Sequence, residues 1–255
     1  NTQEVLASMP QAMKLAVGVG EDLDKTTELL ISTVKSFDMS FEDSPKILDV
    51  FANSVAKSMA TVEKLQVSFA RVAPVAKNAR VSFEETTAIL SKLYDLGLKG
   101  SNAGTVLGNV MTRLTTFTDQ STKALKRAGL SAKDVSLEYN TMGESLAKIT
   151  LAMKNNKLGA EQLQYIFGTR GKIITDFLGQ LNGDSIDELT KSYDELVKSI
   201  SDANGAVDKF YGGQTETAQM ALDKLSNSID LFKVAIGEAN KSALVPFAST
   251  LADVI

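Results

Sequence analysis

Apolar side chains along this chain recur at intervals of three and four residues, which is the period of an α-helix. The clearest stripes are Leu48, Phe51 and Val55, then Leu65, Phe69, Val72 and Ala76, then Ile89, Leu93 and Leu96. We find no convincing alternation with the period of two that a half-buried strand requires. The pattern predicts an all-α fold, a multi-helix module with little or no strand.

Two expected helix starts carry a serine followed three residues later by an acid. Ser40 stands before Asp43, and Ser82 stands before Glu85. The serine oxygen can accept a first-turn amide, and the acid lies near the positive end of the helix dipole. Ser82 with Glu85 is a strict capping box, whereas Pro45 offers a competing first residue for the earlier helix.

These two starts are similar in sequence and 42 residues apart, because Phe83 stands 42 positions after Phe41 (83 − 41 = 42). A period near 40 residues would suit stacked helix pairs. The alternative is two similarly capped helices without a repeat. Ser131 with Asp134 is a weaker third copy of the start signal.

The last third of the chain changes to a heptad pattern. One seam covers 186–200, and a longer one consists of Ala218, Leu222, Leu225, Ile229, Phe232, Ile236, Ala239 and Ala243. A seam of about three and a half heptads calls for a partner helix. A coiled coil and an antiparallel hairpin of 186–203 on 214–243 both satisfy it. With a loop signal at 181–185, we expect a helical module at 1–181 and a long coiled-coil-like segment at 182–255.

The most unusual local feature is a cluster of glycines at 97–108. A phosphate-binding loop is excluded, because no Gly-Lys-Ser or Gly-Lys-Thr sequence follows a strand. The spacing of Gly97 and Gly100, and of Gly168 and Gly171, fits the Gly-x-x-Gly clamp of KH modules, but that module needs a sheet.

A role in helix packing fits the cluster better. Gly97 is expected to end one helix, and Ser101 or Asn102 to cap the next. Gly104 and Gly108 lie four residues apart and therefore share a helix face. Without side chains, they would let another backbone approach closely.

The composition narrows the possible chemistry. The 255 residues carry a net charge of −4 and contain neither His nor Cys. The usual zinc ligands and the Cys and His nucleophile systems are therefore missing, and a basic footprint for nucleic acid is not evident. Acid pairs such as Glu84-Glu85 are explained by helix starts. We expect no catalytic residue, cofactor or metal.

Seven segments, in their order and spacing, resemble the core region of phage tail tape measure proteins. They are Met39–Asp43, Ala52–Ser54, Val72–Ala76, Val81–Glu85, Leu96–Leu107, Ala124–Leu130 and Ile166–Gly171. The most specific is the fifth, which is similar to the family pattern G-I-K-G-S-x-A-G-T-x-L, and the last is similar to I-F-G-x-R. The residues singled out for helix packing and the family motif are Gly97, Lys99, Gly100, Ser101, Ala103, Gly104, Thr105, Gly108, Phe167, Gly168 and Arg170, with Ser40, Ser82 and Glu85 as caps.

The chain departs from the family pattern at two places. Gly108 stands where the family usually has Arg, although Arg113 follows, and Arg80 stands where a Gly is expected before the second S-x-E-E element.

The resemblance implies a virion or prophage protein that lines the tail tube, sets tail length and leaves ahead of the DNA. The partners it implies are a few further copies of itself, tube and tip or baseplate proteins, and tail assembly chaperones, in tails assembled in the host cytoplasm. No sequence-specific nucleic-acid contact and no membrane span are expected in this segment. Because the chain opens on Asn1, we expect it to be a piece of a longer protein.

Two other functions stay open at this stage. One is a tail-associated peptidoglycan hydrolase, for which the sequence shows no catalytic set. The other is a membrane-active module for DNA passage, for which the apolar end at 243–255 is the only hint.

Overall fold

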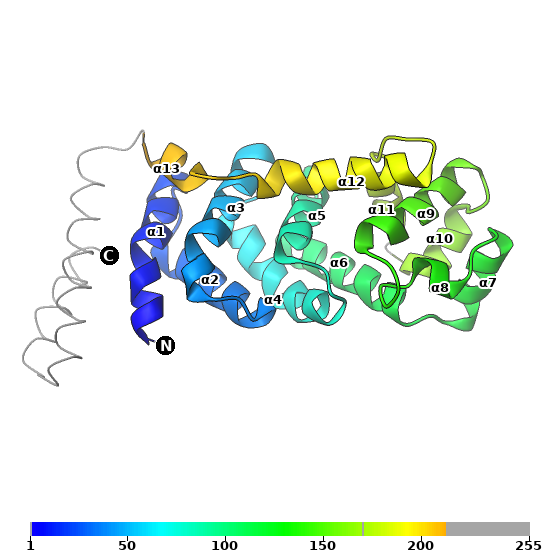
Figure 1. Ribbon diagram of the computed structural model, residues 1–255, viewed down its shortest axis with the longest axis horizontal. Helices are drawn as coiled ribbons and strands as arrows, with labels where there is room; N and C mark the ends of the chain where they lie inside the picture. Colours follow the sequence, from blue (N-terminus) through cyan, green and yellow to red (C-terminus); the bar gives the residue numbers. More distant parts are fainter. Residues whose placement is uncertain (1, 170, 213–255) are drawn as a thin grey trace, which may run out of the picture. The chain divides into compact units, whose positions relative to one another are not determined.

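The computed structural model of the chain describes residues 2–169 and 171–212. This part forms thirteen α-helices and one short 3-10 helix and has no strand (Figure 1). The predicted all-α class is therefore confirmed. No helix within the described ranges is long and apolar enough to cross a membrane. The heptad seam at 218–243, and with it the coiled coil and the hairpin, lies outside the described residues.

The helices differ in length from a single turn to five turns. They are α1 (Thr2–Val19), α2 (Leu23–Phe37), η1 (Phe41–Asp43), α3 (Ser44–Lys57), α4 (Val62–Asn78), α5 (Phe83–Asp95), α6 (Gly100–Thr115), α7 (Asp119–Arg127), α8 (Ala132–Val135), α9 (Met142–Lys154), α10 (Ala160–Phe167), α11 (Gly171–Leu178), α12 (Ile186–Ser201) and α13 (Ala206–Tyr211).

The chain forms two compact units. The described part of the first consists of 2–53 and 203–212, and the second is 54–202. The loop expected at 181–185 lies between α11 and α12. A division of the chain at that loop, into 1–181 and 182–255, stays a prediction.

In the first unit, α1 packs against α2 and α13. Asp49 holds the start of α13, because its two carboxylate oxygens accept the backbone amides of Gly205 and Val207, both at 2.9 Å. The Lys14 ammonium lies 2.9 Å from the Asp208 carboxylate. The start of α13, more than 150 residues further along the sequence, is thereby attached to the N-terminal helices.

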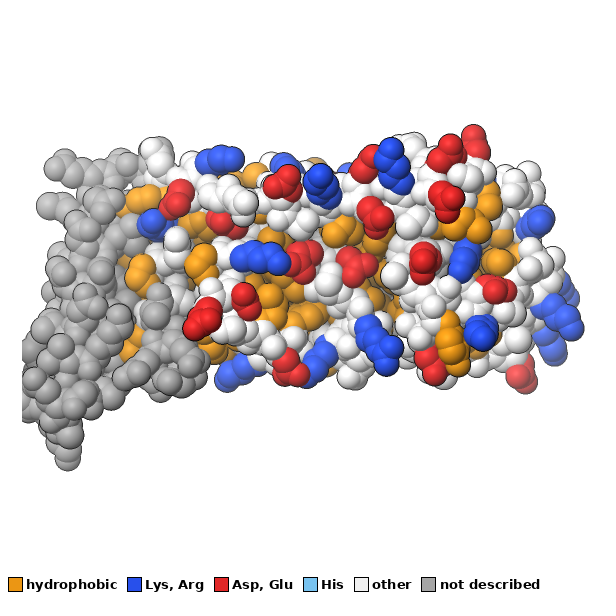
Figure 2. All heavy atoms as spheres, in the orientation of Figure 1, with side chains coloured by type: hydrophobic (Ala, Val, Ile, Leu, Met, Phe, Trp, Pro, Cys, Tyr) orange, Lys and Arg blue, Asp and Glu red, His pale blue; other side chains and the backbone are white. Residues whose placement is uncertain are grey.

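In the second unit, α4 packs against α6, and α5 contacts both. The stripe predicted from Leu65 to Ala76 is fully buried in this core. The rings of Phe69 and Phe83 pack at 6.0 Å between centroids, tilted by 55°. Helix α12 lies against α5 and α9, which gives the seam at 186–200 its partners. The visible surface carries acids and bases interspersed (Figure 2).

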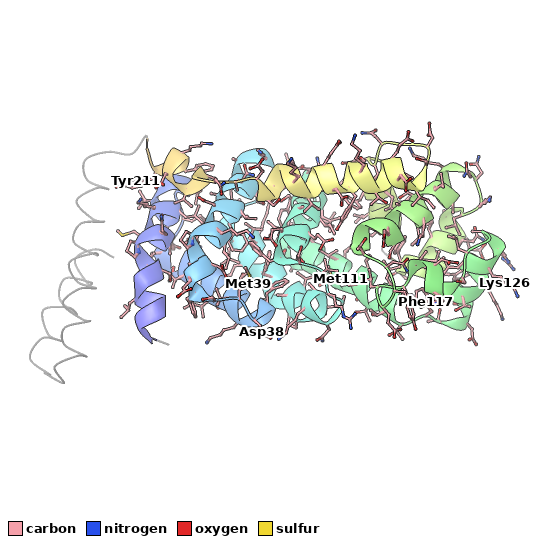
Figure 3. All side chains as sticks on the ribbon, in the orientation of Figure 1. Asp38, Met39, Met111, Phe117, Lys126 and Tyr211 are labelled. Atoms are coloured by element: carbon pink, nitrogen blue, oxygen red, sulfur yellow. The ribbon has the colours of Figure 1, made fainter. Side chains whose placement is uncertain are left out.

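A single kind of junction connects four helix pairs. A residue with positive φ ends the first helix, and the apolar residue after it donates its amide to the carbonyl five positions back, at 2.9–3.1 Å. This is the Schellman arrangement. The junction residues are Asp38, Arg80, Gly97 and Gly129, followed by Met39, Val81, Leu98 and Leu130 (the first pair is labelled in Figure 3).

The repeated junction explains the similarity between the two serine starts. The spacings from Arg80 to Gly97 and from Gly97 to Gly129 are not near 42 residues, so the similarity is local and not a repeat. At the first junction, Ser40 caps η1, which runs directly into α3. The competing start at Pro45 is not used, since Ser44 before it already has helical angles (φ −51°, ψ −42°).

We expect Arg80→Gly to stabilise the protein. A side chain in the left-handed region costs about 1 kcal/mol relative to glycine, and Arg80 has φ 58°. The gain should raise the thermal midpoint by about 2–4 °C. The matched control is Arg71→Gly, at an exposed position inside α4, which should cost about 1 kcal/mol. Equal effects of the two substitutions would contradict this explanation.

Candidate functional site

The glycines at the start of α6 bring its backbone against that of α4. A Cβ atom built on Gly100 would lie 2.8 Å from the carbonyl oxygen of Lys64, and one built on Gly104 would lie 2.6 Å from that of Ser68. No side chain fits at either position without moving a helix. Lys64 and Ser68 are four residues apart in α4, and Gly100 and Gly104 are four residues apart in α6. One turn of α6 therefore packs against one turn of α4.

The closest approach ends before Gly108. A Cβ atom there would meet only the side chain of Val75, at an ordinary 3.9 Å. The face predicted for Gly104 and Gly108 is therefore centred one turn earlier, on Gly100 and Gly104. Ala103 is fully buried beside it.

Buried hydroxyl groups connect α4, α5 and α6 at this contact by hydrogen bonds. The Tyr94 hydroxyl of α5 donates to Ser68 Oγ at 2.7 Å and lies 3.1 Å from the carbonyl oxygen of Lys64. Ser68 Oγ in turn donates to the carbonyl oxygen of Gly100 at 2.6 Å. Burial raises the pKa of Tyr94 well above its usual range, although the Ser68 hydrogen bond lowers it. The phenol therefore stays protonated and acts as a donor.

The polar residues of the glycine motif lie away from this contact. Lys99 is exposed at the N-cap of α6 and makes no side-chain capping bond. Ser101 and Thr105 are half-buried, and the Thr105 hydroxyl donates to the Ser101 carbonyl at 2.8 Å. The expectation that Ser101 or Asn102 caps this helix is wrong, because both already belong to its first turn. Gly97 ends α5 with φ 84°.

The cap of α5 also holds α12. Glu85 Oε2 accepts from the amide and the hydroxyl of Ser82, at 3.0 and 2.9 Å. Glu85 Oε1 accepts from the Tyr193 hydroxyl at 3.1 Å. Burial, and then the charge and hydrogen bond of Glu85, raise the pKa of Tyr193. Its ring lies against Gly143 of α9, where a Cβ atom would meet Cδ1 at 2.6 Å.

Further acids are also used as caps. Ser40 accepts from Glu42 and donates its amide to Asp43, both at 3.1 Å. The weaker signal at Ser131 is a complete box, and the backbone and hydroxyl bonds from Ser131 lower the pKa of Asp134. Thr141 and Glu144 form another box at α9. Within 2–169 and 171–212, no group of three or more Asp, Glu, His or Cys residues could hold a metal.

The last family motif meets α6 at a small polar recess. The Arg113 guanidinium donates to the carbonyl oxygen of Tyr165 at 3.3 Å. A Cβ atom on Gly168, which has φ 84°, would lie 3.0 Å from Arg113 Nε. The recess is about 140 Å³ in volume and is lined by Val106, Asn109, Arg113, Phe167, Gly168 and Thr169. The Arg170 side chain lies outside the described residues.

Sequence reasoning found the glycines but missed their partners. Ser68 and Tyr94, which hold the α4–α6 contact together, and Arg113, which meets the later motif, were not singled out for contacts. The available signal was Ser68, a polar residue next to Phe69 in an apolar stripe. A functional role of the motif residues beyond helix packing stays a prediction.

We expect Gly104→Ala to destabilise the second unit by about 1–3 kcal/mol, because the added methyl would press on the Ser68 backbone. Gly108→Ala is the control, since its methyl has room and alanine is favoured in a helix by up to about 1 kcal/mol. Urea unfolding of the two variants measures the difference. A Gly104→Ala variant as stable as Gly108→Ala would show that the close approach is not required.

Comparisons with known proteins find sequence similarity to phage tail proteins. The sequence model of a family described as phage-related minor tail protein matches residues 1–169. A tape measure protein of Pneumococcus phage Dp-1 is 23% identical over 256 residues, covering 99% of this chain and 22% of that protein. A probable tape measure protein of Escherichia phage P2 is 26% identical over 242 residues, covering 93% of this chain and 29% of that protein.

The chain thus spans less than a third of the length of either of these relatives. Among solved structures, none matches it. The family match takes in every helix from α1 to α10, including the glycine contact of α4 and α6. The chain belongs to the family of phage-related minor tail proteins.

Proposed function

We propose that this chain is a part of a tape measure protein, whose full length sets the length of a phage tail and which leaves the tail tube ahead of the DNA. The observation that carries the proposal is the similarity to two phage proteins named as tape measure proteins over 99% and 93% of the chain. The helical architecture is compatible with it, because a helix rises by a constant ~1.5 Å per residue.

Within that protein, residues 39–115 serve as an assembly module and not as a piece of the ruler. Here the chain folds back on itself, since α6 rests directly on α4. A ruler gains length from every residue, whereas helices packed side by side add little. The compact contact of α4 and α6 instead suits a folded surface that other tail proteins recognise.

The partners follow from the location in the tail. We propose that a few copies lie together in the tube lumen, in contact with tube and tip or baseplate proteins, after assembly with chaperones in the host cytoplasm. The family membership supports a place in the tail. The heptad seam at 218–243 supports contact between copies.

The same proposal makes this part of the chain structural and not catalytic. The acids that could act in hydrolysis are used in folding, as Glu85 and Glu144 are at the starts of α5 and α9. We therefore expect no clearing when the 255-residue chain is run on a zymogram of cell walls. Clearing that a Glu85→Gln variant with an intact fold abolishes would contradict the structural role.

In-frame deletions in the full-length gene test the assembly role. Deleting 39–115 should abolish tails, because the module that other tail proteins recognise is lost. If these 77 residues (115 − 39 + 1) were ruler, tails would form and be shorter by about 115 Å. Electron microscopy of the particles separates the two results.

A pair of point variants controls for the size of the deletion. Gly104→Ala should reduce the yield of tails but leave the length of the remaining tails unchanged, whereas Gly108→Ala should leave both unchanged. A change in tail length with Gly104→Ala would count against the assembly role.

A further inference from the structure

The polar recess between α6 and the end of α10 holds a guanidinium with no acid among the described residues of its wall. These residues are Val106, Asn109, Arg113, Phe167, Gly168 and Thr169. Val106 and Phe167 are buried, Arg113 is half-buried, and Asn109 and Thr169 are exposed. The recess is therefore accessible from solvent, and Arg113 gives it a positive charge.

Two contacts hold the Arg113 guanidinium in place. Its Nη1 donates to the carbonyl oxygen of Tyr165 at 3.3 Å. A Cβ atom on Gly168 would lie 3.0 Å from Nε, 3.1 Å from Nη2 and 3.2 Å from Cζ, so the guanidinium lies directly against the backbone there. A guanidinium has five N–H donors, and no described residue accepts a hydrogen bond from the edge formed by Nε and Nη2. Two parallel donors of this kind match the two oxygens of a carboxylate.

The size and charge of the recess select a carboxylate. Its volume is about 140 Å³, whereas pockets for drug-sized ligands have about 300–1,000 Å³. The end of one side chain fits, and a nucleotide does not. Arg113 is the only base among the described residues of the wall. One guanidinium balances the single charge of a carboxylate, but a phosphate monoester carries a charge of about −1.5 to −2.

We propose that the recess binds the carboxylate of an Asp or Glu side chain from a partner protein, bonded through both oxygens to the Nε–Nη2 edge of Arg113. The amide of Asn109 and the hydroxyl of Thr169 line the same recess and can donate as well. Val106 and Phe167 offer apolar surface to the methylene groups of the inserted side chain. That the partner is another tail protein rests on the proposed function, since α6 belongs to the assembly module.

Cations on a neighbouring helix favour an acidic partner. Lys123, Lys126 and Arg127 are exposed on α7, and this spacing places them on one helix face. Lys and Arg side chains gather around α7 in Figure 2, and Lys126 is labelled in Figure 3. Helix α10 packs against both α6 and α7. The hydrogen bond and the charge of Glu161 raise the pKa of Tyr165, and the charge of Arg127 lowers it. Arg127 therefore lies near the residue whose carbonyl holds the guanidinium of the recess, and it adds to the attraction for an acidic segment.

A titration of the 255-residue chain with sodium acetate tests the site. The chain has five arginines, so their side-chain Nε–H signals can be followed by NMR, and Arg113→Gln assigns one of them by its loss. With sodium chloride at equal ionic strength as the reference, we expect the Arg113 signal to shift saturably, with a dissociation constant of about 10–100 mM. Arg71, exposed on α4, is the internal control and should not saturate. Equal behaviour of the two arginines, or tighter binding of inorganic phosphate than of acetate, would overturn the carboxylate site.

Variants in the full-length gene test the use of the site in tails. Arg113→Gln removes the charge and should lower the yield of tails at least about tenfold. Arg113→Lys keeps the charge and should lower the yield less, and Arg71→Gln, the matched control, should leave it unchanged. Thermal unfolding of the 255-residue chain detects any loss of fold. Equal yields for the two Arg113 variants, in step with equal falls in the thermal midpoint, would show that only the Tyr165 bond matters and would overturn the proposal.

The two measurements separate the site from the proposed function. Normal tails with Arg113→Gln, alongside acetate binding by the unchanged chain, would overturn the tail protein as the partner and leave the carboxylate site standing. The deletion of 39–115 tests the assembly role independently, because it is read from the presence and length of tails.

Discussion

The second unit depends on one contact, in which the backbone of α6 lies directly on that of α4. Gly100 and Gly104 permit it, since any side chain there would overlap Lys64 or Ser68. The carbonyls of Lys64 and Gly100 lie inside helices, where each already accepts an intrahelical amide. The hydroxyls of Ser68 and Tyr94 bond to the same carbonyls in addition and so connect α4, α5 and α6 by hydrogen bonds of 2.6–3.1 Å. The two glycines and the two hydroxyl groups therefore stabilise the same contact.

The junctions between helices show the same priority of backbone geometry over residue type. Gly97 adopts its positive φ at little cost, but Arg80 adopts nearly the same turn with a full side chain. The turn persists because the amide of Val81 bonds to the carbonyl of Ala76 and Ser82 at once caps the next helix. Two hydrogen-bonded helix ends outweigh a local cost of about 1 kcal/mol. The departure from the family pattern at Arg80 thus leaves the junction intact.

Helix positions could be read from the sequence, because the stripe from Leu65 to Ala76 and the sequence around Ser82 depend on near neighbours. Contacts between residues far apart in the sequence could not be read from it. Nothing local to Arg113 indicates that it meets Gly168, and nothing local to Glu85 indicates Tyr193, 108 residues away. The start of α6 was misplaced for the same reason. Its first helical residue is Gly100, which lies against Lys64, and a serine cap at Ser101 would leave that contact outside the helix.

The way this part folds bears on the proposed role in setting tail length. Helix α6 has 16 residues and would be about 24 Å long, but it packs alongside α4 and adds little to the extent of the chain. The glycines make this part of the chain compact, whereas a ruler needs length. The same residues cannot provide both. The chain covers only 22% and 29% of two relatives named as tape measure proteins. In relatives of that size most residues lie outside the matched region, so the assembly role proposed for 39–115 leaves length to be set by other segments.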